Sequence, residues 1–261
     1  MWGDGGGGGG ERAAAMGLLV DVFPLVGVGL ANALFFAPLP GVASAVRSGS
    51  LGAFNPLPQA VMLLSTGAWV MYSLSVANSY IFIANAPGCV ASLGSYVATL
   101  PLIRSAETRR SVQIIVTAGV ALKIALAGGL VFGRVSEQSR SFVLGLYGSV
   151  LCVVMFAAPL STVFNVIATA DSSSIYAPLT LAQVLNCGTW TAYGIAIGDI
   201  WVWAPNGCGL VLGLVQALLK LIYPEVAANI PRRSILGEEA KALVHSTKGL
   251  TKATSSDNDE V

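Results

Sequence analysis

Two tryptophans and two asparagines recur at a constant separation. Trp69 and Trp190 lie 121 residues apart (190−69), and so do Asn85 and Asn206 (206−85). A carboxamide both donates and accepts hydrogen bonds, as a sugar hydroxyl does, and an indole face offers apolar contact without charge. We expect the four side chains to form one neutral pocket for hydroxyl-rich solutes. In the alternative interpretation, the asparagines hold helices together and the tryptophans fill the core.

The same register extends over two longer segments, residues 67–88 and 188–209. Gly67, Tyr72 and Gly88 in the first segment match Gly188, Tyr193 and Gly209 in the second. Shared Gly, Trp, Tyr and Asn positions in one register are much less frequent by chance than apolar matches. We interpret the pattern as an internal duplication, which bears on the whole fold. The two matching glycines that follow the asparagines are expected to allow close helix packing.

The composition places most of the chain in lipid. Hydrophobic residues make up 54% of the 261 residues and charged residues only 10%, whereas soluble domains carry about 25% charged residues. The net charge of +1 gives no basic surface for nucleic acid. The four cysteines lie in apolar runs without C-x-x-C spacing, so we expect them to be small core residues.

Seven runs are long and apolar enough to be transmembrane helices, which need about 20 such residues. They cover residues 17–46, 56–77, 79–102, 112–133, 141–168, 175–197 and 200–223. With the N-terminus outside, ten Lys and Arg fall on inner segments and three on outer ones, which favours a cytosolic C-terminus.

The duplication predicts an all-α integral membrane protein of 3+1+3 architecture. Because copies four spans apart keep the same orientation, the two three-helix repeats are parallel and the fourth span links them. We divide the chain into a disordered Gly-rich arm, a first repeat, a linker helix with its loops, a second repeat and a disordered cytosolic tail. These parts cover residues 1–16, 17–103, 104–139, 140–224 and 225–261. Binding sites in duplicated transporters lie at the repeat interface near the membrane midplane.

Trp and Asn should lie at one depth within each repeat. Trp69 precedes the turn at Val76 by seven residues, and Asn85 follows Ser79 by six. At 1.5 Å per residue these separations are about 10 Å and 9 Å.

Four prolines form a second repeated set. Pro38 and Pro159 are 121 residues apart, and Pro58 and Pro178 are 120 apart. Because proline removes a helix hydrogen bond and bends a helix, the four are candidate hinges for an inner gate. For Pro58 and Pro178 the alternative is simply the preference for proline near a helix start.

Two charged residues fall within predicted spans, Lys123 in span 4 and Asp21 in span 1, and neither has a counterpart in the other repeat. We expect Lys123 to snorkel or to contact a neighbouring helix. The sequence shows no nucleophile–base pair, cluster of metal ligands or phosphate loop. We therefore expect no enzymatic activity, cofactor or metal.

Residues 25–224 resemble the SWEET sugar transporters of the MtN3/saliva type. The most specific segments are FAAPLS (156–161), LNCGTWTAYG (185–194) and APNGCGLVLGLVQALLKLIY (204–223). The resemblance implies that Trp69, Asn85, Trp190 and Asn206 bind the sugar. It adds Ser65 and Asn186 as pocket residues and identifies Pro38, Pro58, Pro159 and Pro178 as the family's proline tetrad.

The family implies a uniporter for mono- or disaccharides that works by alternating access in a membrane, most simply the plasma membrane. Which sugar is carried and whether the chain forms homo-oligomers stay open. Pro58-Gln59 is also the dipeptide of PQ-loop proteins, so an amino-acid exporter is one alternative. A seven-helix receptor is a weaker alternative, because it would not explain the repeat.

Overall fold

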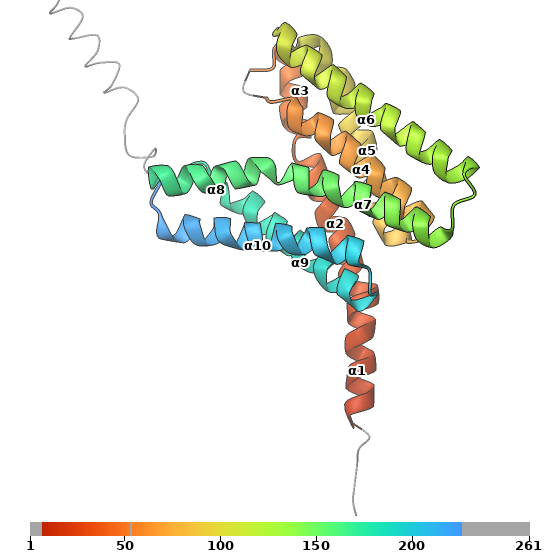
Figure 1. Ribbon diagram of the computed structural model, residues 1–261. Coiled ribbons are helices and arrows are strands. Elements are labelled where there is room, and N and C mark those ends of the chain that lie inside the picture. Colours follow the sequence, from red (N-terminus) through yellow and green to blue (C-terminus); the bar gives the residue numbers. More distant parts are fainter. Residues whose placement is uncertain (1–6, 53, 226–261) are drawn as a thin grey trace, which may run out of the picture.

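The computed structural model describes residues 7–52 and 54–225, and the regular secondary structure in this part of the chain is all helical (Figure 1). The first repeat contains α1 (Gly7–Gly17), η1 (Leu18–Val22), α2 (Phe23–Phe36), α3 (Leu39–Ser48), α4 (Leu57–Ser75), α5 (Ser79–Thr99) and η2 (Leu100–Leu102). The linker is α6 (Ala106–Phe132), and the second repeat contains α7 (Glu137–Met155), α8 (Ala157–Thr169), α9 (Ala177–Ala196) and α10 (Ile200–Ile222).

These helices form the seven predicted spans, two of which are broken into segments. Span 1 runs through α1, η1, α2 and α3, and span 5 through α7 and α8. Five spans are long and apolar enough to cross a membrane on length and composition alone. The other two, α4 and α9, are more polar because they carry buried side chains such as Gln59, Ser65 and Thr180.

Spans 4 and 5 begin earlier than predicted because polar residues form their first turns. Ser105 caps α6 by accepting a hydrogen bond from the Thr108 amide, so the helix begins at Ala106 rather than at residue 112. Ser136 caps α7 in the same way through Ser139, so span 5 begins at Glu137 rather than at 141. Hydropathy places a boundary where the apolar run begins, whereas the backbone becomes helical at the cap.

The prediction of a disordered arm over residues 1–16 is wrong for residues 7–16, which belong to α1. Nucleation is the costly step of helix formation. The helix that follows, η1 and α2, is already formed, and the run Ala13–Met16, whose residues favour helix, can extend it towards the N-terminus. Residues 1–6, and the predicted tail beyond Glu225, lie outside the described residues.

The two repeats close their helical hairpins with equivalent turns. Ala77 follows α4 with a φ of 52°, and Gly198, 121 residues later, follows α9 with a φ of 70°. The next residues, Asn78 and Asp199, cap α5 and α10 by accepting hydrogen bonds from the amides of Ile81 and of Trp201. The duplication therefore includes backbone conformation as well as side chains.

The repeats meet where α2 packs on α9 and α4 packs on α7. Each contact seats a tryptophan of one repeat against a glycine of the other. A methyl group on Gly27 would lie 2.9 Å from the Trp190 indole, and one on Gly148 would lie 3.4 Å from Trp69. The linker α6 instead packs on α4 and runs along the outer edge of the first repeat (Figure 1).

Candidate functional site

A cavity of about 600 Å³ lies between the repeats, and all four residues of the predicted pocket line it. Ser65 and Asn186 line it as well. Both repeats contribute equivalent side chains, among them Phe35 and Phe156. The cavity is mostly apolar and carries a few convergent polar groups, as small-molecule sites typically do.

The two pocket asparagines are held in matching orientations. Asn85 donates from Nδ2 to the Ile81 carbonyl at 2.9 Å, and Asn206 donates from Nδ2 to the Val202 carbonyl at 2.8 Å. Each amide therefore uses one N–H on its own helix. Its carbonyl oxygen and second N–H remain available to a ligand, so each asparagine can both accept from and donate to a hydroxyl.

The two tryptophan rings are also fixed in equivalent ways. Trp69 meets Tyr72 edge to face at 5.6 Å between ring centroids, and Trp190 meets Tyr193 at 5.8 Å. Both indoles are more than 90% buried, with 8% and 6% of their surface exposed. Rigid apolar faces of this kind can hold a ring at low entropic cost.

A pair of crossed hydrogen bonds joins the repeats on the side of the α4–α5 and α9–α10 turns. The Tyr72 hydroxyl donates to Asp199 Oδ2 at 2.7 Å, and Asn78 Nδ2 donates to the Tyr193 hydroxyl at 2.7 Å. Tyr72 and Tyr193 are equivalent, and so are Asn78 and Asp199 (199−78 = 121). We call these four residues the cross-repeat latch. It links the repeats between the pocket and this side of the membrane.

The cavity extends the other way, to the N-terminal ends of α4 and α9, where Pro58, Tyr176 and Leu179 line it. Tyr176 is 68% exposed and ends the loop between α8 and α9. This end is the mouth of the cavity.

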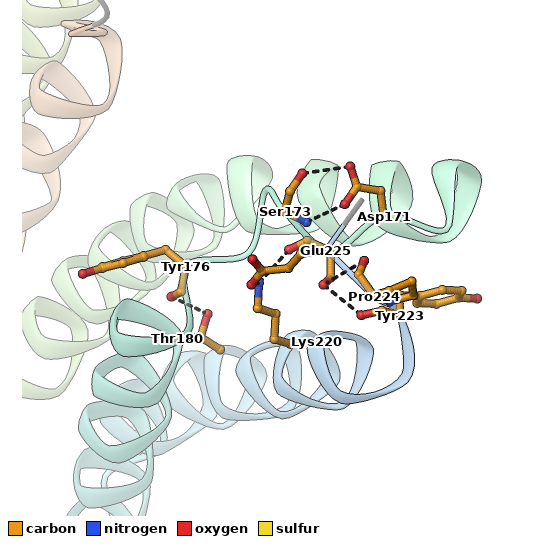
Figure 2. A network of polar contacts seen from close by, with 9 residues as sticks. Asp171, Ser173, Tyr176, Thr180, Lys220, Tyr223, Pro224 and Glu225 are labelled. Carbon is orange, nitrogen blue, oxygen red and sulfur yellow. Dashed lines mark hydrogen bonds and ion pairs between the residues drawn. The ribbon is translucent and has the colours of Figure 1, made fainter. Parts of the chain in front are cut away.

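A polar network holds that loop against the end of α10 (Figure 2). The Ser172 hydroxyl donates to the Tyr223 carbonyl at 2.9 Å, and its amide donates to the Pro224 carbonyl at 3.1 Å. Lys220 donates to the Ser172 carbonyl at 3.0 Å and pairs with Glu225. Figure 2 shows the Tyr176 side chain extending away from these contacts.

The four predicted hinge prolines fall into two structural classes. Pro38 lies at the α2–α3 break, and Pro159 is the third residue of α8, just after the α7–α8 break. Pro58 and Pro178 are second residues of intact helices, α4 and α9, where no backbone N–H is needed.

Three of these prolines line the cavity, and Pro178 does not. Leu179 takes the place equivalent to Pro58 (179−58 = 121). The helix start is offset by 120 residues and the pocket by 121, because α9 has one residue more before its tryptophan.

Sequence reasoning missed several residues of the site. Gln59 and Gln183 line the cavity, but neither has a glutamine 121 residues away. Gly27 and Gly148, which seat the tryptophans, are 121 residues apart, so the repeat offset could have identified them.

The structure also locates the glycine, the two intramembrane charges and the cysteines that the sequence analysis named. A methyl group on Gly88 would collide with Phe35, which explains the need for glycine one turn after Asn85. Lys123 donates to the Leu63 carbonyl at 3.3 Å, a helix–helix contact behind the pocket. Asp21 is exposed in the π-helical turn η1. All four cysteines are free thiols, and Cys152 and Cys187 line the cavity. The prediction that the cysteines are core residues is wrong for Cys208, which is exposed on α10.

Residues 21–100 and 142–228 match the MtN3/saliva family, described as sugar efflux transporters for intercellular exchange. The break between the two matches contains α6. Bidirectional sugar transporter SWEET4 of Oryza sativa subsp. indica is 30% identical over 206 residues, which cover 76% of this chain and 78% of the relative. SWEET7 of Arabidopsis thaliana is 26% identical, covering 80% of this chain and 83% of the relative.

Among solved structures, a eukaryotic SWEET transporter superimposes with a TM-score of 0.71 at 24% identity. The match covers 78% of this chain and 96% of that one. It shows that the two chains share the 3+1+3 helical fold.

Proposed function

The chain belongs to the MtN3/saliva family of sugar efflux transporters, and from this premise we propose that it is a passive, bidirectional sugar uniporter. The observation that carries the proposal is the cavity between the repeats, where two Trp faces and two Asn amides converge. Such a set stacks on a sugar ring and exchanges hydrogen bonds with its hydroxyls.

The charge of the cavity favours a sugar over an amino acid. The side chains that line it carry neither a carboxylate nor an ammonium or guanidinium group. An amino-acid zwitterion that entered the cavity would lose its hydration and find no charged side chain to pair with. Burying unpaired charge in this way is costly. A neutral polyol loses only hydrogen bonds, which the amides replace.

The proposed transport cycle alternates between two closures. In the described state the cross-repeat latch links the repeats on one side of the pocket, and the cavity extends to its mouth on the other. Rocking of the parallel repeats would break the latch and close the mouth, with the breaks at Pro38 and Pro159 taking up the bend. We place the mouth and the C-terminus on the cytosolic side of the plasma membrane, because Lys and Arg are concentrated there.

Uptake in a host without its own sugar carriers tests the proposal. Radiolabelled glucose and sucrose are supplied separately to cells that express wild type, Asn206→Ala or Asn165→Ala. Asn206→Ala should lower uptake at least about tenfold, because a buried hydroxyl of the sugar loses its amide partner. Asn165 lies exposed on α8 and outside the cavity, so Asn165→Ala should transport normally.

Surface expression is measured for each variant. Wild-type cells that take up neither sugar, or an Asn206→Ala variant with normal flux, would contradict the proposal.

A further inference from the structure

Two polar atoms in the cavity wall are buried without hydrogen-bond partners. They are Nε2 of Gln183 and Oδ1 of Asn186, both on α9. Both residues line the cavity. Buried polar atoms in proteins are nearly always paired, so two unpaired ones beside a binding cavity indicate where a ligand supplies the missing partners.

The two atoms are complementary to a single hydroxyl group. Residues three apart on a helix lie on the same face, so Gln183 and Asn186 are neighbours along the α9 wall. Gln183 Nε2 is a donor and Asn186 Oδ1 is an acceptor. A hydroxyl can accept from the first and donate to the second at the same time.

The first repeat has no equivalent pair. The positions 121 residues earlier are Met62 and Ser65, and both line the cavity. Asn85 and Asn206, by contrast, occur in both repeats and already use one N–H each on their own helices. The polar pair therefore breaks the symmetry of the pocket and gives a bound sugar one preferred orientation.

We propose that Gln183 and Asn186 together bind one hydroxyl of a monosaccharide, at the edge of the ring that faces the cavity mouth. Long helical side chains point back towards the helix N-terminus, so the Trp190 ring lies near the level of Asn186. Gln183 lies one turn nearer to the mouth, about 5 Å further along α9. This inference rests on the proposed sugar transport and adds Gln183 as a specificity-determining residue.

Deoxyglucoses, each lacking a single hydroxyl, test the proposal in intact cells. Gln183→Met copies Met62, the equivalent residue of the first repeat. The control is Leu185→Met, which places the same side chain on an exposed face of α9 outside the cavity. In wild type, one deoxy isomer should compete with radiolabelled glucose about tenfold more weakly than glucose itself. In Gln183→Met the KM for glucose should rise about tenfold, because the hydroxyl loses its partner. The deoxyglucose that lacks this hydroxyl should then compete as strongly as unlabelled glucose in the variant, whereas the other isomers should keep their rank.

The pattern across isomers distinguishes a lost hydrogen bond from a change in shape. A purely structural effect of Gln183→Met would weaken every competitor equally, and this result would overturn the proposal. An unchanged KM together with an unchanged order of the competitors would overturn it as well. Asn186→Ser, which copies Ser65, should remove discrimination against the same isomer, so it provides the test if Gln183→Met does not reach the membrane. Absence of sugar uptake by wild type would overturn the proposed function, whereas wild-type flux with unaltered rankings in the variants would overturn only this inference.

Discussion

At the residue scale, the cross-repeat latch is the contact most directly linked to a change of state. Its two hydrogen bonds, Tyr72 to Asp199 and Asn78 to Tyr193, cross the repeat interface, so the repeats cannot separate on this side without breaking both. Asp199 and Asn78 also cap their own helices. The latch can therefore open without moving Asp199 or Asn78 out of place, because the caps keep both side chains oriented.

We predict that Tyr193→Phe opens the latch side of the pocket more often. A neutral hydrogen bond contributes about 0.5–1.5 kcal/mol, so its loss should shift the ratio of the two states about two- to tenfold. Cys152 and Cys187 line the cavity and report its exposure. A membrane-impermeant thiol reagent applied from the latch side should label Tyr193→Phe faster than wild type.

Tyr80→Phe is the control for this prediction. The Tyr80 ring packs edge to face on Tyr193, and the substitution removes only the Tyr80 hydroxyl. Both latch hydrogen bonds stay intact. The label must depend on the cavity thiols, so it should disappear in a variant with both Cys152→Ser and Cys187→Ser. Equal labelling rates in Tyr193→Phe and wild type would argue against a latch that governs access.

At the element scale, α5 and α10 each contain a proline near the pocket asparagine, and a neighbouring span supplies the hydrogen bond that the proline removes. Pro87 in α5 and Pro205 in α10 lack the N–H groups that would bond the carbonyls of Ile83 and Trp201. Asn32 from α2 donates to the Ile83 carbonyl at 3.3 Å, and Ser149 from α7 donates to the Trp201 carbonyl at 3.4 Å. The two repeats thus meet the same backbone need with different residues from spans 1 and 5.

Asn32→Leu should destabilise the protein by about 1–2 kcal/mol, because the Ile83 carbonyl loses its donor in a region without water. Pro87→Ala restores the backbone N–H and should remove most of that penalty. The measurement is unfolding free energy in detergent for both single variants and the double variant. Additive effects would mean that Asn32 does not act through this carbonyl.

The two classes of proline predict different effects on transport. Pro159 follows a break in span 5, and Gln216 of α10 donates to its carbonyl at 3.2 Å. Pro159→Ala should straighten the span and lower the maximal flux several-fold at unchanged KM. Pro178 lies in the first turn of α9, where proline is favoured but neither bends the helix nor removes a helix hydrogen bond, so Pro178→Ala should stay within about twofold of wild type. Initial glucose uptake rates over a range of concentrations separate the two; equal losses would make both prolines hinges.

At the scale of the whole molecule, seven apolar runs and the constant offset of 121 residues were enough to predict the 3+1+3 architecture and four side chains that line the cavity. Trp69 and Asn206 line the same cavity because a duplicated, parallel fold brings the two repeats together around one axis. The offset fails where the repeats differ. Gln183 has Met62 at the equivalent position of the first repeat, so the offset gave no reason to select it. One extra residue in α9 places Leu179, rather than Pro178, at the cavity position equivalent to Pro58.

Boundaries and polar contacts were less predictable for a physical reason. Hydropathy does not detect capped polar turns, so it could not place the start of α6 at Ala106. Partners such as Tyr72 and Asp199 lie 127 residues apart, and only the packing of one repeat on the other brings them together.

The same neutral interior leads to a prediction about energy coupling. A proton-coupled carrier needs a group beside the substrate that gains and loses a proton during the cycle. The cavity wall has no acidic or basic side chain, and Lys123 lies behind α4, bonded to the Leu63 carbonyl. In proteoliposomes, glucose should therefore equilibrate across the membrane at the same rate with and without an imposed pH gradient. An uncoupler should leave this rate unchanged, and the final internal concentration should equal the external one.

Accumulation of glucose above the external concentration, driven by the proton gradient and abolished by the uncoupler, would contradict this prediction. It would show that an ionisable group outside the cavity is coupled to transport. Lys123→Met would then show whether that group is Lys123.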